Sequence, residues 1–128
     1  ISGSANELVK EMAKKHGFDD YQGTIYKTDE NGLYTGEIIP MWDSISKDKQ
    51  VSKLVEQYDL DLSQSYAYGD TSGDFLMLKR VGHPFAINPT RELITKIKED
   101  EELLDKIKII VERKDAIYRI DPHTIDLL

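Results

Sequence analysis

The feature that most constrains the fold is a short strand pattern at residues 65–68 that ends in a Gly-Asp pair and passes directly into a helical pattern at residues 72–80. A second strand pattern follows at residues 84–87, and another helix opens near residue 90. Short apolar strands that alternate with helices indicate a parallel sheet joined by right-handed crossovers. The predicted fold class is therefore α/β, with a Rossmann-like parallel sheet sandwiched by helices.

The N-terminal residues carry the signals of a first helix. Ser4 with Glu7 three residues on predicts a capping box, and the helix should run from about residue 5 to 16. Gly17 is suited to the left-handed conformation that ends a helix. Ile1 would then be the tail of a strand.

The remaining elements follow from periodicity and turn residues. Asn31-Gly32 supplies the positive φ of a β-turn between two β-prone runs, which predicts a small β-hairpin. Apolar residues at helical spacing predict a core-facing helix that begins at residue 46 or 47. The expected segments are the hairpin runs 23–27 and 33–38, the helix to residue 58, and two strands at 107–111 and 116–120.

Length and composition limit the classes of function. A chain of 128 residues suits one domain, residues 1–128. The net charge of −7 opposes binding to nucleic acid. No apolar run approaches the roughly 18 residues of a membrane span, and there is no cysteine for disulfides or thiol catalysis. We expect a protein that contacts neither nucleic acid nor membrane, and a cytoplasmic location as the default.

Asp70 and Asp74 are the strongest candidates for chemistry. They lie one helical turn apart where the strand gives way to the helix, and ligands of open α/β sheets gather just beyond such strand ends. Two carboxylates with room for water and phosphate suit Mg²⁺. The plainer alternative is that Asp70 caps the helix while Asp74 complements its dipole.

The surrounding residues resemble the haloacid dehalogenase superfamily, and most of all its phosphoserine phosphatase-like branch. The resemblance rests on Gly-Asp-x-x-x-Asp, then Phe-Leu-Met-Leu, then Val-Gly-His-Pro-Phe-Ala-Ile-Asn-Pro, within residues 66–93. It covers roughly residues 1 to 100. In that family the matching motif holds Mg²⁺, which implies Asp70 as a direct ligand and Asp74 as a ligand or as a neighbour that orients one.

The same resemblance implies a phosphate site. Lys47, which lies 23 residues before Asp70, matches the family's lysine, with Lys49 as the competitor. Its ammonium would offset the charge of a phosphoryl group. Ser2 matches a Ser or Thr that closes a strand, and its hydroxyl with the Gly3 amide would donate to a phosphate oxygen.

The family's first motif, which supplies the attacking aspartate, has no match in the chain. Asp59-Leu60-Asp61 has the right spacing, but no strand precedes it, and we interpret it as a loop. We therefore expect the C-terminal part of a haloacid dehalogenase-like core, without the first strand, the nucleophile motif and the cap domain.

The resemblance implies a Mg²⁺-dependent hydrolase of a small phosphorylated metabolite in the complete protein, with the 128-residue chain inactive by itself. The alternative is a non-catalytic Mg²⁺-binding or assembly module of the same fold. Loss of the first strand would bare an edge of the sheet. An N-terminal fragment or a swapped second copy is the expected partner at that edge. Trp42, Tyr26 and Tyr34 are expected to be packing residues.

Overall fold

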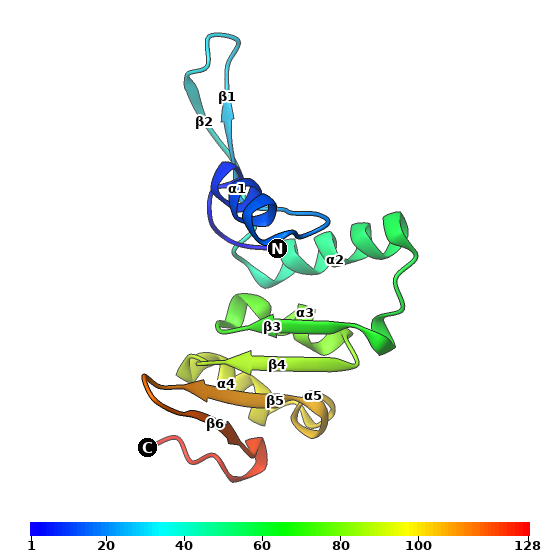
Figure 1. Cartoon of the computed structure of the whole chain (residues 1–128), viewed down its shortest axis with the longest axis vertical. Helices are drawn as coiled ribbons and strands as arrows, with labels where there is room; N and C mark the ends of the chain where they lie inside the picture. The colour runs from blue at the N-terminus through cyan, green and yellow to red at the C-terminus, as the bar shows by residue number, and fades with distance from the viewer.

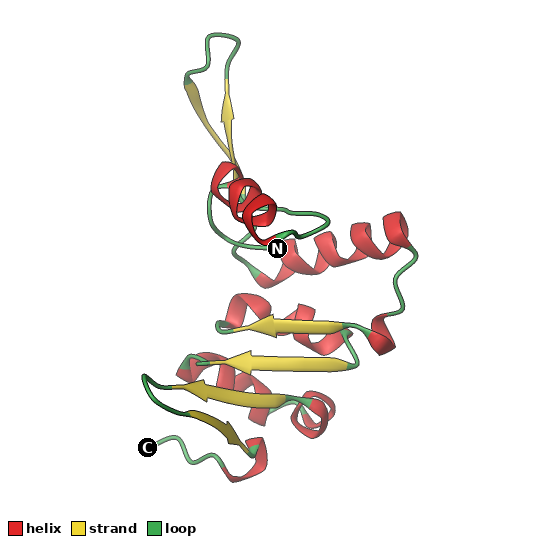
Figure 2. Ribbon diagram, in the orientation of Figure 1, coloured by secondary structure: helices red, strands yellow, loops and turns green.

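The computed structural model describes all 128 residues as two small sheets and the helices around them (Figure 1, Figure 2). The α-helices are α1 (Asn6–His16), α2 (Ser44–Tyr58), α3 (Phe75–Arg80), α4 (Arg91–Lys98) and α5 (Glu101–Lys106). The strands are β1 (Ile25–Thr28), β2 (Tyr34–Ile39), β3 (Tyr66–Gly69), β4 (His83–Ile87), β5 (Lys108–Glu112) and β6 (Ile117–Ile120). Short 3₁₀ turns are η1 (Leu62–Gln64), η2 (Ser72–Asp74) and η3 (Pro122–Thr124).

The larger sheet has the strand order β3-β4-β5-β6. The first three strands are parallel, and β6 turns back antiparallel along β5. The predicted α/β class with a parallel sheet is thus confirmed. The tail that the sequence marked only as two strands forms the antiparallel edge of that sheet.

Helices α3 and α4 lie on one face of the larger sheet, behind the strands in the view of Figure 1, and α5 packs against both of them. The core lies between them and the sheet. Its fully buried side chains include Leu78, Leu93, Ile97, Leu103 and Ile109. Burial of this kind stabilises a fold by roughly 25 cal/mol per Å² of apolar surface removed from water.

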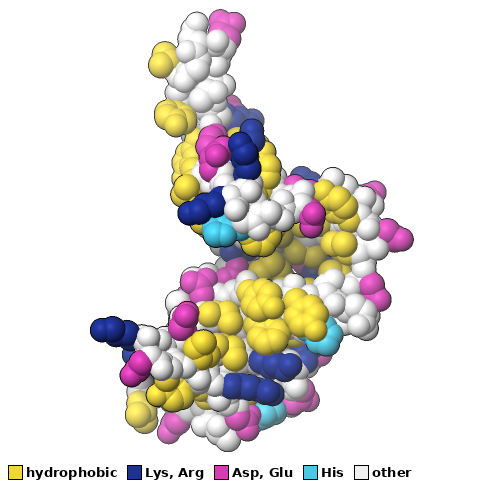
Figure 3. Space-filling model, in the orientation of Figure 1, with side chains coloured by type: hydrophobic (Ala, Val, Ile, Leu, Met, Phe, Trp, Pro, Cys, Tyr) yellow, Lys and Arg dark blue, Asp and Glu magenta, His cyan; other side chains and the backbone are white.

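The other face of the same sheet carries stacked aromatic side chains instead of a helix. Tyr66 and Tyr68 both lie against Phe85, with ring centroids 6.2 and 5.1 Å from it. Each tyrosine is 60% exposed. The space-filling view shows a hydrophobic patch over this part of the molecule with basic side chains beside it (Figure 3). Helices therefore cover one face of the sheet in this chain, where the sequence predicted both.

The N-terminal residues form a separate parallel ladder. The Ser2 amide donates to the Gln22 carbonyl, the Thr24 amide to the Ser4 carbonyl, and the Asn6 amide to the Thr24 carbonyl, at 2.8 to 2.9 Å. Residues 2–6 and 22–24 thus lie side by side, as expected for a strand tail before α1. The β1–β2 hairpin projects from this end of the molecule (Figure 1).

One local prediction was wrong. Ser4 does not cap α1, because its main chain is held in the ladder with Thr24, and the N-cap is Ala5 without a side-chain bond. The helix predicted to open near residue 90 is α4, and a second short helix follows it, because the Asp100 carboxylate accepts from the Leu103 amide and begins α5. Gly17 ends α1 with a φ of 72°, as predicted.

None of the helices has the length and apolar character needed to cross a lipid bilayer.

Candidate functional site

Three distant segments meet at the carboxyl end of β3. The N-terminal residues, the start of α2 and the turn after β3 enclose a cavity of about 380 Å³. Its lining includes Ser2, Gly3, Lys47, Asp70 and Asp74. The structure therefore brings together the residues that the sequence singled out from the N-terminus, the middle and the strand end. In parallel sheets this is the edge at which ligands bind.

Lys47 and Asp74 form a buried ion pair at the base of the site. Lys47 Nζ lies 2.5 Å from Asp74 Oδ1, and the two side chains are 9% and 6% exposed. Lys47 reaches this position because Asp43 caps α2 one turn earlier, where its carboxylate accepts from the Ser46 amide. A buried charge pair of this geometry fixes both partners, since either one alone would be costly to bury.

The second oxygen of Asp74 holds the turn after β3. Asp74 Oδ2 accepts from the Asp70 and Thr71 amides at 3.0 and 3.2 Å. Burial by itself raises the pKa of Asp74, but Lys47 and these amides outweigh it and leave the pKa below its usual range. Asp74 is therefore an ionised carboxylate, with one oxygen paired to Lys47 and the other bonded to two main-chain amides.

Gly69 allows the carboxylate to come this close. A Cβ built on Gly69 would lie 2.4 Å from Asp74 Cβ and 2.9 Å from Asp74 Oδ2. No side chain fits at that distance without movement of the turn. The glycine of the Gly-Asp pair is thus required by the approach of Asp74 to the end of β3.

The Asp70 carboxylate differs from that of Asp74, because it is exposed in the cavity and makes no hydrogen bond or ion pair with the protein. Its main-chain carbonyl accepts from the Thr90 amide, which fixes the residue at the strand end. No group of three or more carboxylate, histidine or cysteine side chains is gathered here or elsewhere. One free carboxylate on a rigid strand end fits a Mg²⁺ ion that completes its shell with phosphate and water.

The segment of Ser2 and Gly3 also lines the cavity. The Ser2 hydroxyl oxygen accepts from the Ser4 amide at 3.1 Å, which leaves the hydroxyl proton available to a ligand. Thr24, which is fully buried, donates its hydroxyl to the Gly3 carbonyl at 2.8 Å and accepts from the Met41 amide at 3.1 Å. Sequence reasoning missed Thr24, because a threonine within a β-prone run gives no signal that it will bond two distant segments.

The alternative residues lie outside the cavity. Lys49 is exposed and does not line it, whereas Lys47 does. Asp59 ends α2 with a φ of 51°, and the Asp61 carboxylate accepts from the Ser63 amide and hydroxyl at the start of η1. The segment of Asp59 and Asp61 is a capped loop in the structure.

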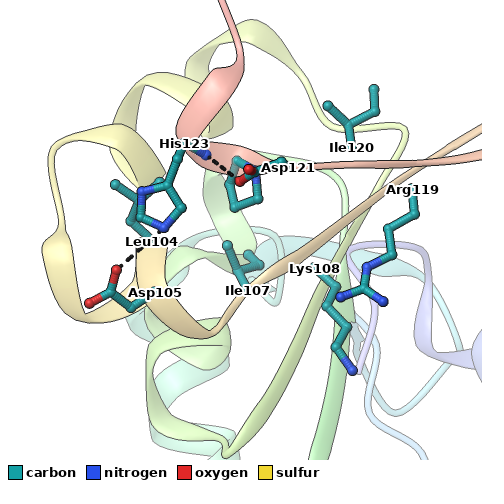
Figure 4. A pocket seen from close by; sticks show the side chains of 9 residues that line it. Leu104, Asp105, Ile107, Lys108, Arg119, Ile120, Asp121 and His123 are labelled. Atoms are coloured by element: carbon teal, nitrogen blue, oxygen red, sulfur yellow. Dashed lines mark hydrogen bonds and ion pairs between the residues drawn. The ribbon is translucent and has the colours of Figure 1, made fainter.

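A different cavity of about 440 Å³ lies between α5, β6 and η3 (Figure 4). Lys108 and Arg119 line it, but so do two acids, Asp105 and Asp121. His123 Nε2 lies 3.4 Å from Asp105 Oδ1, and the His123 amide donates to Asp121. Its positive charges are thus offset within the cavity, and none of the motif residues reaches it.

Comparisons with known proteins agree with the fold. The family model for haloacid dehalogenase-like hydrolases matches residues 1–79. The "Inhibition of morphological differentiation protein" of Streptomyces azureus is 33% identical over 93 residues, which are 73% of this chain and 34% of that protein. A phosphoserine phosphatase of Mycobacterium tuberculosis is 29% identical over 100 residues, 77% of this chain and 32% of that protein.

Among solved structures, a substrate-bound phosphoserine phosphatase superposes with a TM-score of 0.63 at 22% identity, over 90% of this chain and 50% of that one. This likeness shows the fold. The chain belongs to the haloacid dehalogenase-like hydrolase family. It spans about one third of the length of the curated relatives that it matches.

Proposed function

We propose that this chain supplies the residues that bind the phosphoryl group and Mg²⁺ in a phosphomonoester hydrolase of the phosphoserine phosphatase-like type. The observation that carries the proposal is the convergence of Ser2, Lys47 and Asp70 on one cavity at the end of β3. Each has a different task there, and each comes from a separate segment. The family match and the phosphatases among the relatives support the same chemistry.

The roles follow from charge and hydrogen-bonding capacity. The Ser2 hydroxyl and the Gly3 amide can donate to a phosphoryl oxygen, and the Lys47 ammonium can offset its negative charge. Asp74 holds the Lys47 ammonium in place, because it is the ammonium's buried partner. Asp70 would hold Mg²⁺, which supplies further positive charge to the phosphoryl oxygens when bound. Selection among phosphorylated metabolites then depends on the groups around this cavity.

The attacking carboxylate would come from a strand that lies between the N-terminal ladder and β3. A cavity of about 320 Å³ runs along this position, with Ile1 on one side, Tyr66 and Ala67 on the other, and Val51 and Leu54 of α2 beside them. It shares Ile1 with the polar cavity at the end of β3. β3 is the free edge of its sheet and can pair with an added strand. An apolar strand placed there would end beside Lys47 and Asp70.

The strand could come from an N-terminal fragment or from a second copy by swapping. A non-catalytic assembly module, which is the alternative function, would use the same edge without the chemistry. Mg²⁺ and phosphate binding separates the two, since only the hydrolase needs both ligands to bind together.

The test is calorimetric titration of the chain with Mg²⁺ at saturating inorganic phosphate. Wild-type chain should bind the ion, and Asp70→Asn should lose most of this binding. Asp59→Asn is the matched control, since it removes the same charge from an exposed residue outside the cavity. Equal binding by wild type and Asp70→Asn would refute the site, and loss of binding in Asp59→Asn would show that net charge alone is responsible.

A further inference from the structure

Trp42 is the one tryptophan of the chain, and it lines the same cavity as Ser2, Lys47 and Asp70. The sequence predicted a packing residue, but half of the side chain is exposed. It precedes Asp43, the cap of α2, so it lies at the turn that leads into the helix of Lys47. A half-exposed aromatic side chain that lines a polar cavity is a candidate for contact with a ligand.

Two glycines from different segments lie close to Trp42, at its carbonyl oxygen and its Cβ. A Cβ on Gly73 would lie 2.2 Å from the Trp42 carbonyl oxygen, and a Cβ on Gly3 would lie 3.0 Å from Trp42 Cβ. The residue is also tied on both sides, through Met41 to Thr24 and through Ser44, whose hydroxyl accepts from the Leu76 amide. Trp42 is therefore fixed to both walls of the cavity.

The lining of the cavity has polar groups and large apolar side chains. Its polar groups, Ser2, Lys47 and Asp70, suit a phosphoryl group and its metal. Its large apolar side chains are Ile1, Trp42 and Tyr68. A volume of about 380 Å³ falls in the roughly 300–1,000 Å³ range of sites that hold whole small molecules, so there is space beyond a phosphate.

We infer that Trp42 contacts the organic part of the phosphomonoester and determines specificity for planar, apolar groups. The inference rests on the proposed function, because the phosphoryl group must be held by Ser2 and Lys47 for its substituent to reach the indole. A flat ring can stack on the indole face, whereas a small charged substituent such as that of phosphoserine gains little from it. The preferred substrates would be aryl phosphates or other phosphomonoesters with a planar group.

The test compares three probes, inorganic phosphate, phosphoserine and phenyl phosphate, each titrated into the Mg²⁺-loaded chain by calorimetry. Phenyl phosphate should bind about five- to tenfold more tightly than phosphoserine, which is the scale of one aromatic stacking contact. Because Trp42 is the chain's only tryptophan, its fluorescence should respond most to phenyl phosphate. Trp42→Ala should abolish the preference while inorganic phosphate still binds, and Trp42→Phe should keep part of it.

Circular dichroism and thermal unfolding show whether Trp42→Ala still folds, and Trp42→Phe serves if it does not. An unchanged ratio of phenyl phosphate to phosphoserine affinity in either folded variant would overturn the inference while leaving the phosphate site intact. Failure of all three probes to bind the wild-type chain would instead refute the proposed function, and the inference with it.

Discussion

Removal of Asp74 should destabilise the chain far more than removal of Asp70, although both belong to the same motif. Asp74→Ala leaves the Lys47 ammonium buried without its partner at 2.5 Å and frees two amides of the turn. Loss of one partner from a buried pair costs about 3–5 kcal/mol. Since domains of this size are stable by about 5–15 kcal/mol, that loss removes a large part of the total.

Asp70→Ala is the matched control, because its carboxylate is exposed and bonded to nothing in the protein. Asp70→Ala should change the free energy of unfolding by no more than about 0.5 kcal/mol. Urea unfolding at pH 7 measures both variants, and an unchanged dependence on denaturant shows that the same transition is compared. The double variant Lys47→Met with Asp74→Leu should recover much of the loss, because it removes both buried charges. An Asp74→Ala effect below about 1 kcal/mol would refute the buried pair.

The Lys47–Asp74 pair makes the stability of the folded chain depend on pH, and the sign of this dependence follows from the pKa of Asp74. The pKa of Asp74 is below the usual value of 3.8 in the folded chain, so the unfolded chain binds its proton first as the pH falls. The contribution of ionised Asp74 to the free energy of unfolding is present above about pH 4, and it is lost as the pH falls through the folded pKa. Asp74→Ala should lack this part of the acid destabilisation, and a wild-type acid profile in that variant would contradict the assignment.

Three further outcomes are expected. Gly69→Ala should cost about 1–3 kcal/mol by urea unfolding, because its Cβ would meet Asp74 at 2.4 Å, whereas Gly32→Ala meets no atom within 4 Å and tests only its positive φ. The chain alone should release no phosphate from p-nitrophenyl phosphate, because we expect the attacking carboxylate to come from another segment; turnover lost in Asp61→Ala would overturn this. Light scattering with denaturing mass spectrometry should show that the chain associates with a second copy or with an N-terminal fragment, and a well-folded 14.7 kDa monomer without a companion would contradict it.

The order of helices and strands was predictable because periodicity and turn residues are local signals. Gly17 and Gly32 adopt the positive φ that their positions suggested, and the strand before Asp70 lies where the apolar run ended. The break before α5 was less visible, because Asp100 lies within a run of charged residues that fits one solvated helix equally well. The antiparallel course of β6 depends on pairing across the sheet, which a local pattern does not encode.

The site was predictable only as a set of residues. The spacing placed Asp70 and Asp74 at the end of a strand, and the resemblance placed Lys47 and Ser2. Only the structure shows that Asp74 pairs with Lys47 while the Asp70 carboxylate is free, since this pairing depends on how α2 packs against the turn after β3. The place of Trp42 at the cavity likewise depends on tertiary contacts, since two glycines far away in the sequence approach its main chain and Cβ.

The most direct test of the central claim is to map where inorganic phosphate binds in the presence of Mg²⁺, by amide chemical shifts of the labelled chain. We predict that the largest changes fall on the amides of Ser2, Gly3 and Asp70, around the cavity at the end of β3. The cavity of Lys108 and Arg119 is the internal control, because it contains basic side chains whose charge nearby acids offset. Changes centred on Lys108 and Arg119, or none at Ser2 and Asp70 under saturating phosphate, would contradict the account.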